Sequence, residues 1–343
     1  MTDSTSPQSS HSPRPRRVFV IGATGTIGRA AVRALAQQGH EVVCFVRPGA
    51  GVGGTLTPAD SVALFDGAAV RFGDVTSPAS LARDGFRDER FDALVSCLAS
   101  RTGAPKDAWA IDHQAHVDAL ATAREAGVTQ MVLLSAICVQ KPRLEFQKAK
   151  LAFEQELIAS GLDYSIVRAT AFFKSLSGQI ARVQRGKPFL MFGDGNLTAC
   201  KPVSDDDLGR YLANCVSDPA QSNRVLPIGG PGPAITPREQ GEKLFALLGR
   251  EPRFSRAPVS MLDAIIAALA AAGRVVPSLR DKAELARIGR YYATESMLVW
   301  DEKAGRYDAD ATPSTGSDTL FDHYARVVAG EASVERGAHS VFS

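Results

Sequence analysis

Short apolar runs and longer helical segments alternate along the first two thirds of the chain. The apolar runs are rich in β-branched residues and have the length of buried strands. We expect strands at Arg17–Ile21, Glu41–Val46, Ala69–Phe72, Ala93–Cys97, Met131–Ala136, Tyr164–Val167 and Val225–Ile228. Helical periodicity between them predicts helices at Thr26–Gln38, Trp109–Ala126, Leu144–Ser160 and Asp206–Val216. This alternation is typical of an α/β fold of the Rossmann type, a doubly wound parallel sheet with helices on both faces.

The rhythm changes after Gly229, where a cluster of glycine and proline residues marks a turn. Helical patterns follow at Pro237–Leu248, Val259–Ala272 and Leu279–Tyr292, and the run Asp308–Ser317 is weakly patterned. We therefore expect three parts: a disordered Ser- and Pro-rich tail (residues 1–16), a Rossmann-type domain (17–229) and a mostly helical region (230–343) packed on the sheet, which would contact the substrate.

Composition and charge narrow the class of protein. A net charge of +2 gives no support for a nucleic-acid groove. The N-terminal tail lacks the apolar core of a secretory signal, and the segment Met261–Val276 is too short to cross a bilayer. The five cysteines have no metal-binding spacing, which favours buried free thiols in a reducing compartment. We expect a cytoplasmic protein without a protein-bound metal; the sequence leaves its oligomeric state open.

A glycine-rich turn follows the first predicted strand directly. Its sequence runs from Gly22 to Gly28 as Gly-Ala-Thr-Gly-Thr-Ile-Gly, and a helix is expected from Thr26. Missing side chains let backbone N–H groups approach a pyrophosphate, and the helix N-terminus adds partial positive charge. The turn therefore predicts a dinucleotide site, formed by Gly22, Thr24, Gly25, Thr26, Ile27 and Gly28.

The next strands indicate which dinucleotide is bound. The second strand ends at Arg47, where an NAD site would usually carry a carboxylate; a guanidinium instead suits the 2′-phosphate of NADPH. Asp74 and Val75 follow the third strand, where Asp74 could reach the adenine or simply form a turn. Cys97, Leu98 and Ala99 end the fourth strand, where small residues let the backbone pass close to the cofactor.

The segment after the fifth strand carries the candidate chemistry. Short-chain dehydrogenases have a serine at the end of this strand and a Tyr-x-x-x-Lys pair on the next helix, whose two side chains share one face. Here Ser135 is present and the spacing survives as Phe146-x-x-x-Lys150, without the tyrosine hydroxyl. Reduction of a carbonyl needs a phenol that exchanges a proton with the substrate oxygen. The pattern therefore predicts either an inactive dehydrogenase or a reductase of a carbon–carbon double bond, with Lys150 and Ser135 in the catalytic site and Lys150 also on the nicotinamide ribose.

Several blocks resemble the NADPH-dependent divinyl chlorophyllide a 8-vinyl reductases, atypical NmrA-like members of the short-chain dehydrogenase superfamily. They are Gly22–Gly28, Leu134–Pro142, Glu145–Lys150, Val167–Lys174, Gly193–Gly195, Lys201–Asp207, Ile228–Pro231 and Tyr291–Met297. The glycine turn is shared by the whole superfamily, whereas the blocks around Ser135 and Lys150 are more specific. The resemblance covers the chain from about Arg17 to Tyr324.

This resemblance implies reduction of the C8 vinyl group of a divinyl chlorophyllide or protochlorophyllide to ethyl, in chlorophyll or bacteriochlorophyll synthesis. The substrate is a broad apolar chlorin that carries magnesium, so aromatic lining is expected. Candidate lining residues are Phe146, Phe172, Phe173, Tyr291 and Tyr292, and His113, His116 and His323 are weaker candidates for approaching the magnesium. The proton donor stays open between Lys150, Tyr291, Tyr292 and a water.

Three alternatives remain from the sequence. The chain could be an NADPH-sensing regulator without turnover, a reductase of another conjugated alkene of the isoflavone-reductase type, or a structural relative in a membrane complex. Lys150 favours an enzyme, because a protein that reads only the adenine end needs no lysine on the nicotinamide side. The apolar segment Val259–Ala272 could be buried or could contact a pigment-bearing membrane peripherally.

Overall fold

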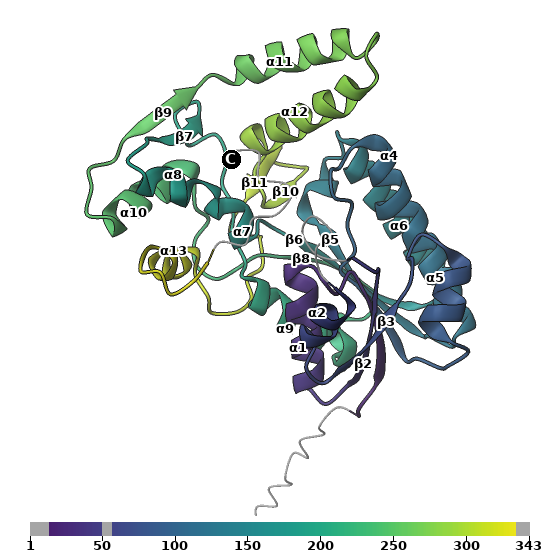
Figure 1. Cartoon of the computed structure of the whole chain (residues 1–343). Coiled ribbons are helices and arrows are strands. Elements are labelled where there is room, and N and C mark those ends of the chain that lie inside the picture. Colours follow the sequence, from purple (N-terminus) through teal and green to yellow (C-terminus); the bar gives the residue numbers. More distant parts are fainter. Residues whose placement is uncertain (1–13, 50–56, 334–343) are drawn as a thin grey trace, which may run out of the picture.

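Seven parallel strands form the central sheet, shown in Figure 1, in the order β3-β2-β1-β4-β5-β6-β8. Their bounds are β1 Arg17–Ile21, β2 Glu41–Val46, β3 Ala68–Phe72, β4 Ala93–Ser96, β5 Gln130–Ala136, β6 Asp163–Ala169 and β8 Arg224–Ile228. The order reverses between β1 and β4, as it does in doubly wound dinucleotide-binding sheets, so the predicted fold class is confirmed. Parallel strands need both faces covered, which explains why these runs are apolar throughout.

The computed structural model describes residues 14–49 and 57–333. Most of the predicted tail, residues 1–13, therefore lies outside the described residues. Arg16 already belongs to the fold, because its backbone N–H donates to His40 and its guanidinium donates to Gln130 at 2.6 Å.

Helices cover both faces of the sheet. The segments along this part of the chain are α1 Thr26–Gln37, α2 Pro58–Ala63, α3 Pro78–Ser80, η2 Leu81–Phe86, α4 Pro105–Ala108, η3 Trp109–Gln114, α5 Ala115–Glu125, η4 Ile137–Gln140, α6 Glu145–Ala159, α9 Asp205–Ser217 and η6 Pro219–Gln221. One apolar core lies between the sheet and the helices α1 and α9, and a second lies under η2, α5 and α6.

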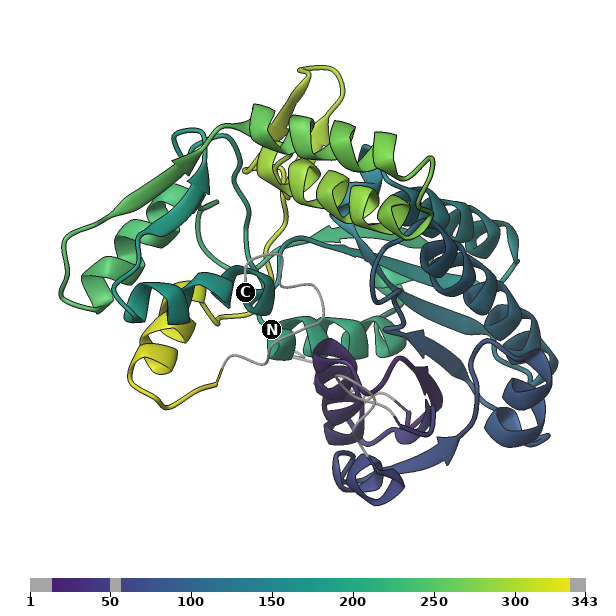
Figure 2. The ribbon, with the colours of Figure 1, turned by 45° about the horizontal axis from the view of Figure 1, so that its top comes forward.

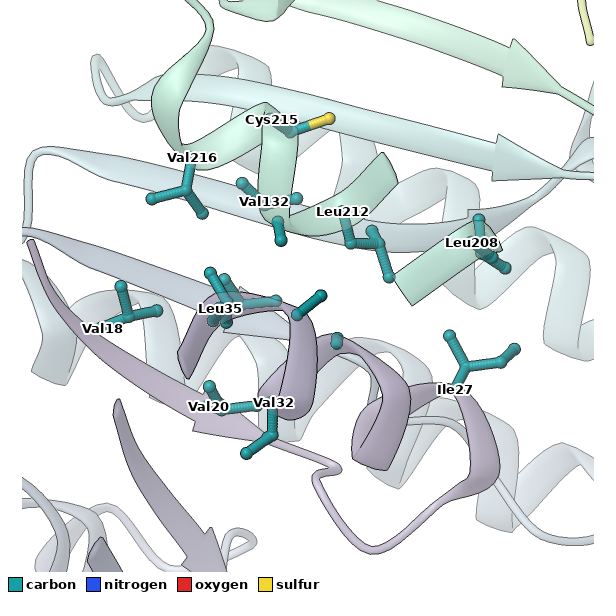
Figure 3. Close-up of a cluster of buried hydrophobic side chains, with 14 of the residues drawn as sticks. Val18, Val20, Ile27, Val32, Leu35, Val132, Leu208, Leu212, Cys215 and Val216 are labelled. Carbon is teal, nitrogen blue, oxygen red and sulfur yellow. The ribbon is translucent and has the colours of Figure 1, made fainter. Parts of the chain in front are cut away.

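Figure 3 shows the first of these cores, where side chains of α1 and α9 meet those of β1 and β5. Gly209 lets the two helices approach, since a Cβ there would stand 2.6 Å from the carbonyl carbon of Ala30. Burial of this apolar surface fixes the N-terminus of α1 at the carboxyl edge of the sheet.

A second lobe stands beside the sheet and is assembled from two stretches of the chain (Figures 1 and 2). The stretch between β6 and α9 supplies α7 Phe173–Leu176, η5 Ser177–Gln179, α8 Ile180–Gln184 and β7 Phe189–Phe192. The stretch after β8 supplies α10 Pro237–Leu247, β9 Phe254–Ala257, α11 Val259–Ala272, α12 Ser278–Thr294, β10 Val299–Asp301, β11 Arg306–Asp308 and α13 Leu320–Val328. Residues before Gly229 thus pack with the C-terminal region, and the domain boundary at that residue stays a prediction.

Two small sheets in this lobe were absent from the sequence-based expectation. The strand β7 pairs in parallel with β9, and β10 pairs antiparallel with β11. Each strand has only three or four residues, too few for a clear alternating pattern.

Residues 309–317 form no helix or strand beyond an isolated bridge at Ser314, as expected of a weakly structured run, yet hydrogen bonds hold the run in place. This run is held against α9 and the end of β8, where Gly229 exchanges backbone hydrogen bonds with Pro313 and Thr315. The buried carboxylate of Asp207 accepts from the N–H groups of Ser317 and Asp318, at 3.2 and 3.0 Å. The run has few apolar residues because hydrogen bonds, rather than apolar burial, fix it.

Candidate active site

The glycine turn lies between the end of β1 and the start of α1, and its outer glycines are required by packing. Gly22 has φ +72°, and a Cβ there would stand 2.3 Å from the backbone nitrogen of Leu98. A Cβ on Gly28 would stand 2.2 Å from the carbonyl oxygen of Gly22. These two residues therefore close the turn onto the neighbouring strand end and onto the helix.

The middle glycine has a different environment. Gly25 is exposed and has the ordinary φ of −67°, and a Cβ there would meet the Gly22 carbonyl oxygen at 3.5 Å, an ordinary van der Waals distance. It is also the N-cap of α1, a helix start with no side-chain cap and no acidic residue in its first turn. An exposed helix start without a side-chain cap suits an anionic diphosphate, so the residues present fit a dinucleotide. Thr24 and Thr26 are half-buried beside Gly25, and Ile27 is buried in the core beneath.

Positive charge gathers at the ends of β2 and β4. Arg47 is exposed directly after β2, and partial burial together with the charge of Arg101 lowers its pKa, an effect that Asp74 opposes. Two guanidinium groups close enough to perturb each other form a favourable place for a phosphate. Asp74 accepts from the backbone N–H and the hydroxyl of Thr76, at 2.9 and 2.7 Å. Its carboxylate therefore stabilises the turn after β3, which was the alternative to contact with the adenine. Val75 is half-buried after it.

The loop after β4 connects the glycine turn to the predicted catalytic lysine. Cys97 and Leu98 touch the place of the missing Gly22 side chain, and Ala99 is exposed beside them. The backbone N–H of Ser100 donates to the Asp112 carboxylate at 3.2 Å. A continuous run of contacts therefore joins the glycine turn to Asp112.

Lys150 forms a buried ion pair. Its Nζ lies 2.9 Å from Oδ1 of Asp112, and the two side chains are 13% and 0% exposed. Burial alone would raise the pKa of Asp112, but the charge of Lys150 and hydrogen bonds from Ser100 and Lys150 hold it below its usual value. Oδ2 of Asp112 has no hydrogen-bond partner within the described part of the chain. The pair lines a small crevice together with His116, Ser135 and Phe153.

A widened helical turn presents Asp112. The sequence predicts one helix over Trp109–Ala126, but the structure has the π-helical segment η3 between α4 and α5. The expected helix is present over nearly its whole length, and the π turn is a local feature that the expectation did not include. Such turns occur often at functional sites.

His116 supports this turn from below. Its Nε2 lies 2.8 Å from the Ser96 hydroxyl and its Nδ1 lies 2.8 Å from the Ile111 carbonyl oxygen, which fixes the ring. Burial, followed by the charge of Lys150, lowers the pKa of His116 to about 4, so the ring is neutral.

Ser135 lies on the same side of α6 but faces another carboxylate. Its hydroxyl donates to Oε1 of buried Glu154 at 2.5 Å, and Glu154 pairs with Arg168 at 2.5 Å. The Ser135 hydroxyl therefore donates its hydrogen bond to Glu154. Its predicted catalytic role stays a prediction.

The predicted aromatic lining divides into core and edge positions. Phe146 and Phe173 are buried in the second lobe's core, and Phe172 is half-buried against the sheet core. Phe146 lies beside Gly103 and Ile288, where α6 meets α12.

The two tyrosines of α12 differ. Tyr291 is buried and donates its hydroxyl to the carbonyls of Cys138 and Lys141, at 3.1 and 3.3 Å. Tyr292 packs edge-on against it and is nearly half exposed. Tyr291 therefore holds α12 to the segment after β5.

The three histidines do not converge. His116 is buried beneath η3, His113 pairs with Glu156 at 2.7 Å, and His323 packs on the ring of Phe173. Residues 14–49 and 57–333 contain no group of three or more His, Cys, Asp or Glu side chains that could hold a metal.

Sequence reasoning missed Asp112, Glu154 and Glu295. Glu295 is buried and accepts from Lys141, Arg143 and the Tyr307 hydroxyl, which ties the conspicuous Ser135–Pro142 block to the β10–β11 hairpin. Burial would raise the pKa of Glu295, but these partners lower it. The available signal for a buried carboxylate partner was the basic pair of Lys141, in the block Leu134–Pro142, and Arg143 just after it.

Comparison with known proteins gives a consistent answer. Residues 22–219 match a family model described as NAD(P)H-binding. The chain is 50% identical over 342 residues to the chloroplastic divinyl chlorophyllide a 8-vinyl-reductase of Oryza sativa subsp. indica, covering 98% of this chain and 84% of the relative. It is 47% identical over 337 residues to the enzyme of the same name from Arabidopsis thaliana, covering 95% and 80%.

Among solved structures, an NADPH-dependent quinone oxidoreductase from Escherichia coli, complexed with NADPH, superposes with a TM-score of 0.65. The match covers 91% of this chain and 99% of that one at 19% identity, and it supports the fold. Both plant relatives are named chloroplastic, and the cytoplasmic location predicted for this chain is not confirmed.

Proposed function

The chain belongs to the divinyl chlorophyllide a 8-vinyl-reductase family, and we propose that it uses NADPH to reduce the C8 vinyl group of a divinyl chlorophyllide or protochlorophyllide to ethyl. The observation that carries this proposal is Phe146, one helical turn before Lys150, where a carbonyl reductase needs a tyrosine hydroxyl. An alkene carries no oxygen to protonate, so a phenyl ring is compatible with its reduction.

The proposal that NADPH is the cofactor rests on two places in the site, the start of α1 and the end of β2. The uncapped start of α1 holds the diphosphate, and Arg47, with Arg101 nearby, holds a 2′-phosphate. NADPH supplies a hydride when bound. Replacing Arg47 with Glu should raise the KM for NADPH and reduce the preference for NADPH over NADH. An unchanged preference for NADPH would show that Arg47 does not contact the cofactor.

Lys150 is the residue we place beside the nicotinamide ribose. Asp112 holds its ammonium in one orientation and keeps a counter-charge within 2.9 Å. The ammonium donates to the ribose hydroxyls and favours the negative charge that spreads into the macrocycle during reduction. Asp112 is thus a positioning residue, and Ser135 is a positioning residue for Glu154 and Arg168.

A proton must reach the vinyl carbon next to the ring. Tyr291 donates to two backbone carbonyls and is buried, which favours a structural role. Tyr292, Lys150, whose side chain is 13% exposed, and a water beside Lys150 remain the candidate donors. Phe172 is half-buried and is the aromatic candidate for contact with the chlorin, whereas Phe146 and Phe173 lie in the second lobe's core.

The proposed substrate indicates the compartment in which the protein acts. A chlorophyllide is made and consumed by pigment-synthesising enzymes, so we propose that the chain acts in a photosynthetic compartment, in chlorophyll or bacteriochlorophyll synthesis. No helix in residues 14–49 and 57–333 is long and apolar enough to cross a bilayer.

The proposal is tested with purified protein, NADPH and divinyl chlorophyllide. Loss of a conjugated vinyl group should move the Soret band to shorter wavelength, with one NADPH consumed per product. Monovinyl chlorophyllide is the matched control and should give no NADPH oxidation. Tight NADPH binding without any conversion would instead support a sensing regulator, and turnover only of isoflavone-type alkenes would support the other reductase class.

A further inference from the structure

The helix α11 has an apolar surface on all sides, yet it is not packed into a core. Its sequence from Val259 to Ala272 carries one charged residue, Asp263, which is paired with Arg290 of α12. None of its residues is buried, and Met261 and Ile265 are each more than two fifths exposed. A helix that is apolar all round is normally enclosed by protein or lipid. In Figures 1 and 2, α11 lies at the outer edge of the second lobe and runs beside α12.

The turn that joins α11 to α12 extends this apolar surface. Val275 is 85% exposed and Val276 is 46% exposed. Two β-branched side chains at the end of a hairpin cost solvation free energy without contributing to a core. The exposed surface thus continues from the helix to the turn. We call α11 together with residues 273–277 the apolar hairpin.

Basic side chains border the turn. Arg274 lies within it, and Arg280 and Lys282 lie in the first turns of α12, with Asp281 as the neighbouring carboxylate. Arg280 donates its Nε to the Gly273 carbonyl at 2.9 Å, which holds its guanidinium at the turn. Neither Arg274 nor Lys282 has an ion-pair partner among residues 14–49 and 57–333. Apolar side chains with a basic border are the arrangement that interfacial helices present to anionic lipid.

We propose that the apolar hairpin docks on an anionic lipid surface and holds the enzyme there peripherally. A helix of this length, about 21 Å, can lie along the headgroup boundary but cannot span the bilayer. The basic border of the turn favours anionic lipid as the occupant, and a second copy of the chain is the alternative that the experiment below separates. This inference goes beyond the reductase activity and does not depend on it.

The hairpin is joined to the proposed active site through α12. Ile288 of α12 lies next to Gly103 and in the same core as Phe146. Docking would therefore place the lobe that contacts the chlorin close to the lipid, where an apolar pigment dissolves.

The experiment is flotation of the full chain with vesicles of phosphatidylcholine, with and without phosphatidylglycerol. Binding should require the anionic lipid and should weaken as salt is raised. The double variant Val275→Glu, Val276→Glu and the double variant Arg274→Glu, Lys282→Glu should each lower vesicle binding roughly tenfold or more. Ile158→Glu is the matched control, since Ile158 is 44% exposed on α6 and outside the hairpin, and it should bind like the parent protein.

Two further measurements keep the proposal falsifiable. Circular dichroism and NADPH affinity of each variant should match the parent, which separates lost docking from lost folding. Equal binding of all variants, or no binding of the parent to anionic vesicles, would overturn the proposal. It would also be overturned if the Val275→Glu, Val276→Glu variant converted a dimer into a monomer while vesicle binding stayed unchanged. The vesicle experiment does not depend on catalysis, so a protein that fails to reduce the vinyl group would still be expected to bind anionic vesicles.

Discussion

The three glycines of the turn perform different tasks. Gly22 and Gly28 have no room for a Cβ, because protein backbone lies within 2.3 and 2.2 Å of its place. Gly25 is exposed, and a Cβ there would be at an ordinary van der Waals distance from its nearest contact. Sequence alone predicts three glycines for one ligand, whereas the structure shows that only the middle one is free of packing constraints.

This difference gives a matched pair of variants. Gly25→Ala should fold with nearly unchanged stability but bind NADPH at least roughly tenfold more weakly, a loss of about 1.4 kcal/mol. Gly28→Ala should instead lower the free energy of unfolding, by about 1–3 kcal/mol, because backbone must shift. Titration of NADPH fluorescence and urea unfolding measure the two effects. Equal NADPH affinity of Gly25→Ala and the parent would remove this residue from the site.

The structure identifies Asp112 as the ion-pair partner of Lys150, which the sequence did not indicate. Asp112→Asn keeps the shape of the side chain but removes the counter-charge of Lys150. We expect kcat/KM to fall roughly tenfold or more, mainly through a higher KM for NADPH, because the ammonium is no longer held toward the ribose hydroxyls. Asp107→Asn is the control, because that half-buried carboxylate accepts from the backbone N–H and the hydroxyl of Thr102 rather than pairing with Lys150. A lower kcat with an unchanged KM for NADPH would contradict the positioning role.

The strands of the large sheet and the helices that cover it were predictable because each buries an apolar face. The limits of β1, β2 and α11 agree with the expectation to the residue, and the other five strands of the sheet differ at one or both ends. The π turn at Asp112 was not predictable, because a single widened turn inside a helix has no distinct sequence pattern. The strands β7 and β9 have four residues each, too few to show an alternating pattern. Asp112 and Lys150 come together only through tertiary structure, so no local spacing could link them.

The segment that crosses α9 offers a test at the same scale. Asp207→Ala removes the acceptor for the Ser317 and Asp318 N–H groups and the partner of Arg210. We expect about 2 kcal/mol lower stability, with faster amide exchange at these two residues. Asp206→Ala on the same helix breaks a half-exposed pair with Arg33 and should change stability by less than about 1 kcal/mol. Unchanged exchange in the Asp207 variant would show that the segment is held otherwise.

The second lobe is built from segments that lie far apart in the sequence. Residues of β7 and α8 precede the last strand of the large sheet, yet they pack with α10 and β9, which follow it. Pairing between distant segments depends on the whole fold, so the composition of either segment could not predict it. The places of the glycine turn and Arg47 after strands, and of Lys150 on the helix after β5, were predictable from the alternation of strands and helices, whereas their roles stay predictions.

The stability of the whole molecule should depend on His116. Burial lowers the pKa of His116 to about 4, below the ordinary 6.5, so the unfolded chain binds a proton that the folded chain excludes. This contribution to stability is full above pH 6.5 and is lost as the pH falls toward 4. Between pH 7.5 and 5 the loss should be about 2 kcal/mol in urea unfolding. His116→Gln should show a smaller pH dependence than the parent; an equal dependence would place the acid sensitivity elsewhere.

Transfer of isotope tests the central claim most directly. NADPH carrying deuterium at both C4 positions of the nicotinamide should give, with divinyl chlorophyllide, a product whose C8 ethyl group contains one deuterium. Mass spectrometry and proton NMR of the pigment would locate it at the former vinyl terminus. An ethyl group without deuterium, or oxidation of NADPH that leaves the vinyl group intact, would contradict hydride delivery from the glycine-turn site to the vinyl group.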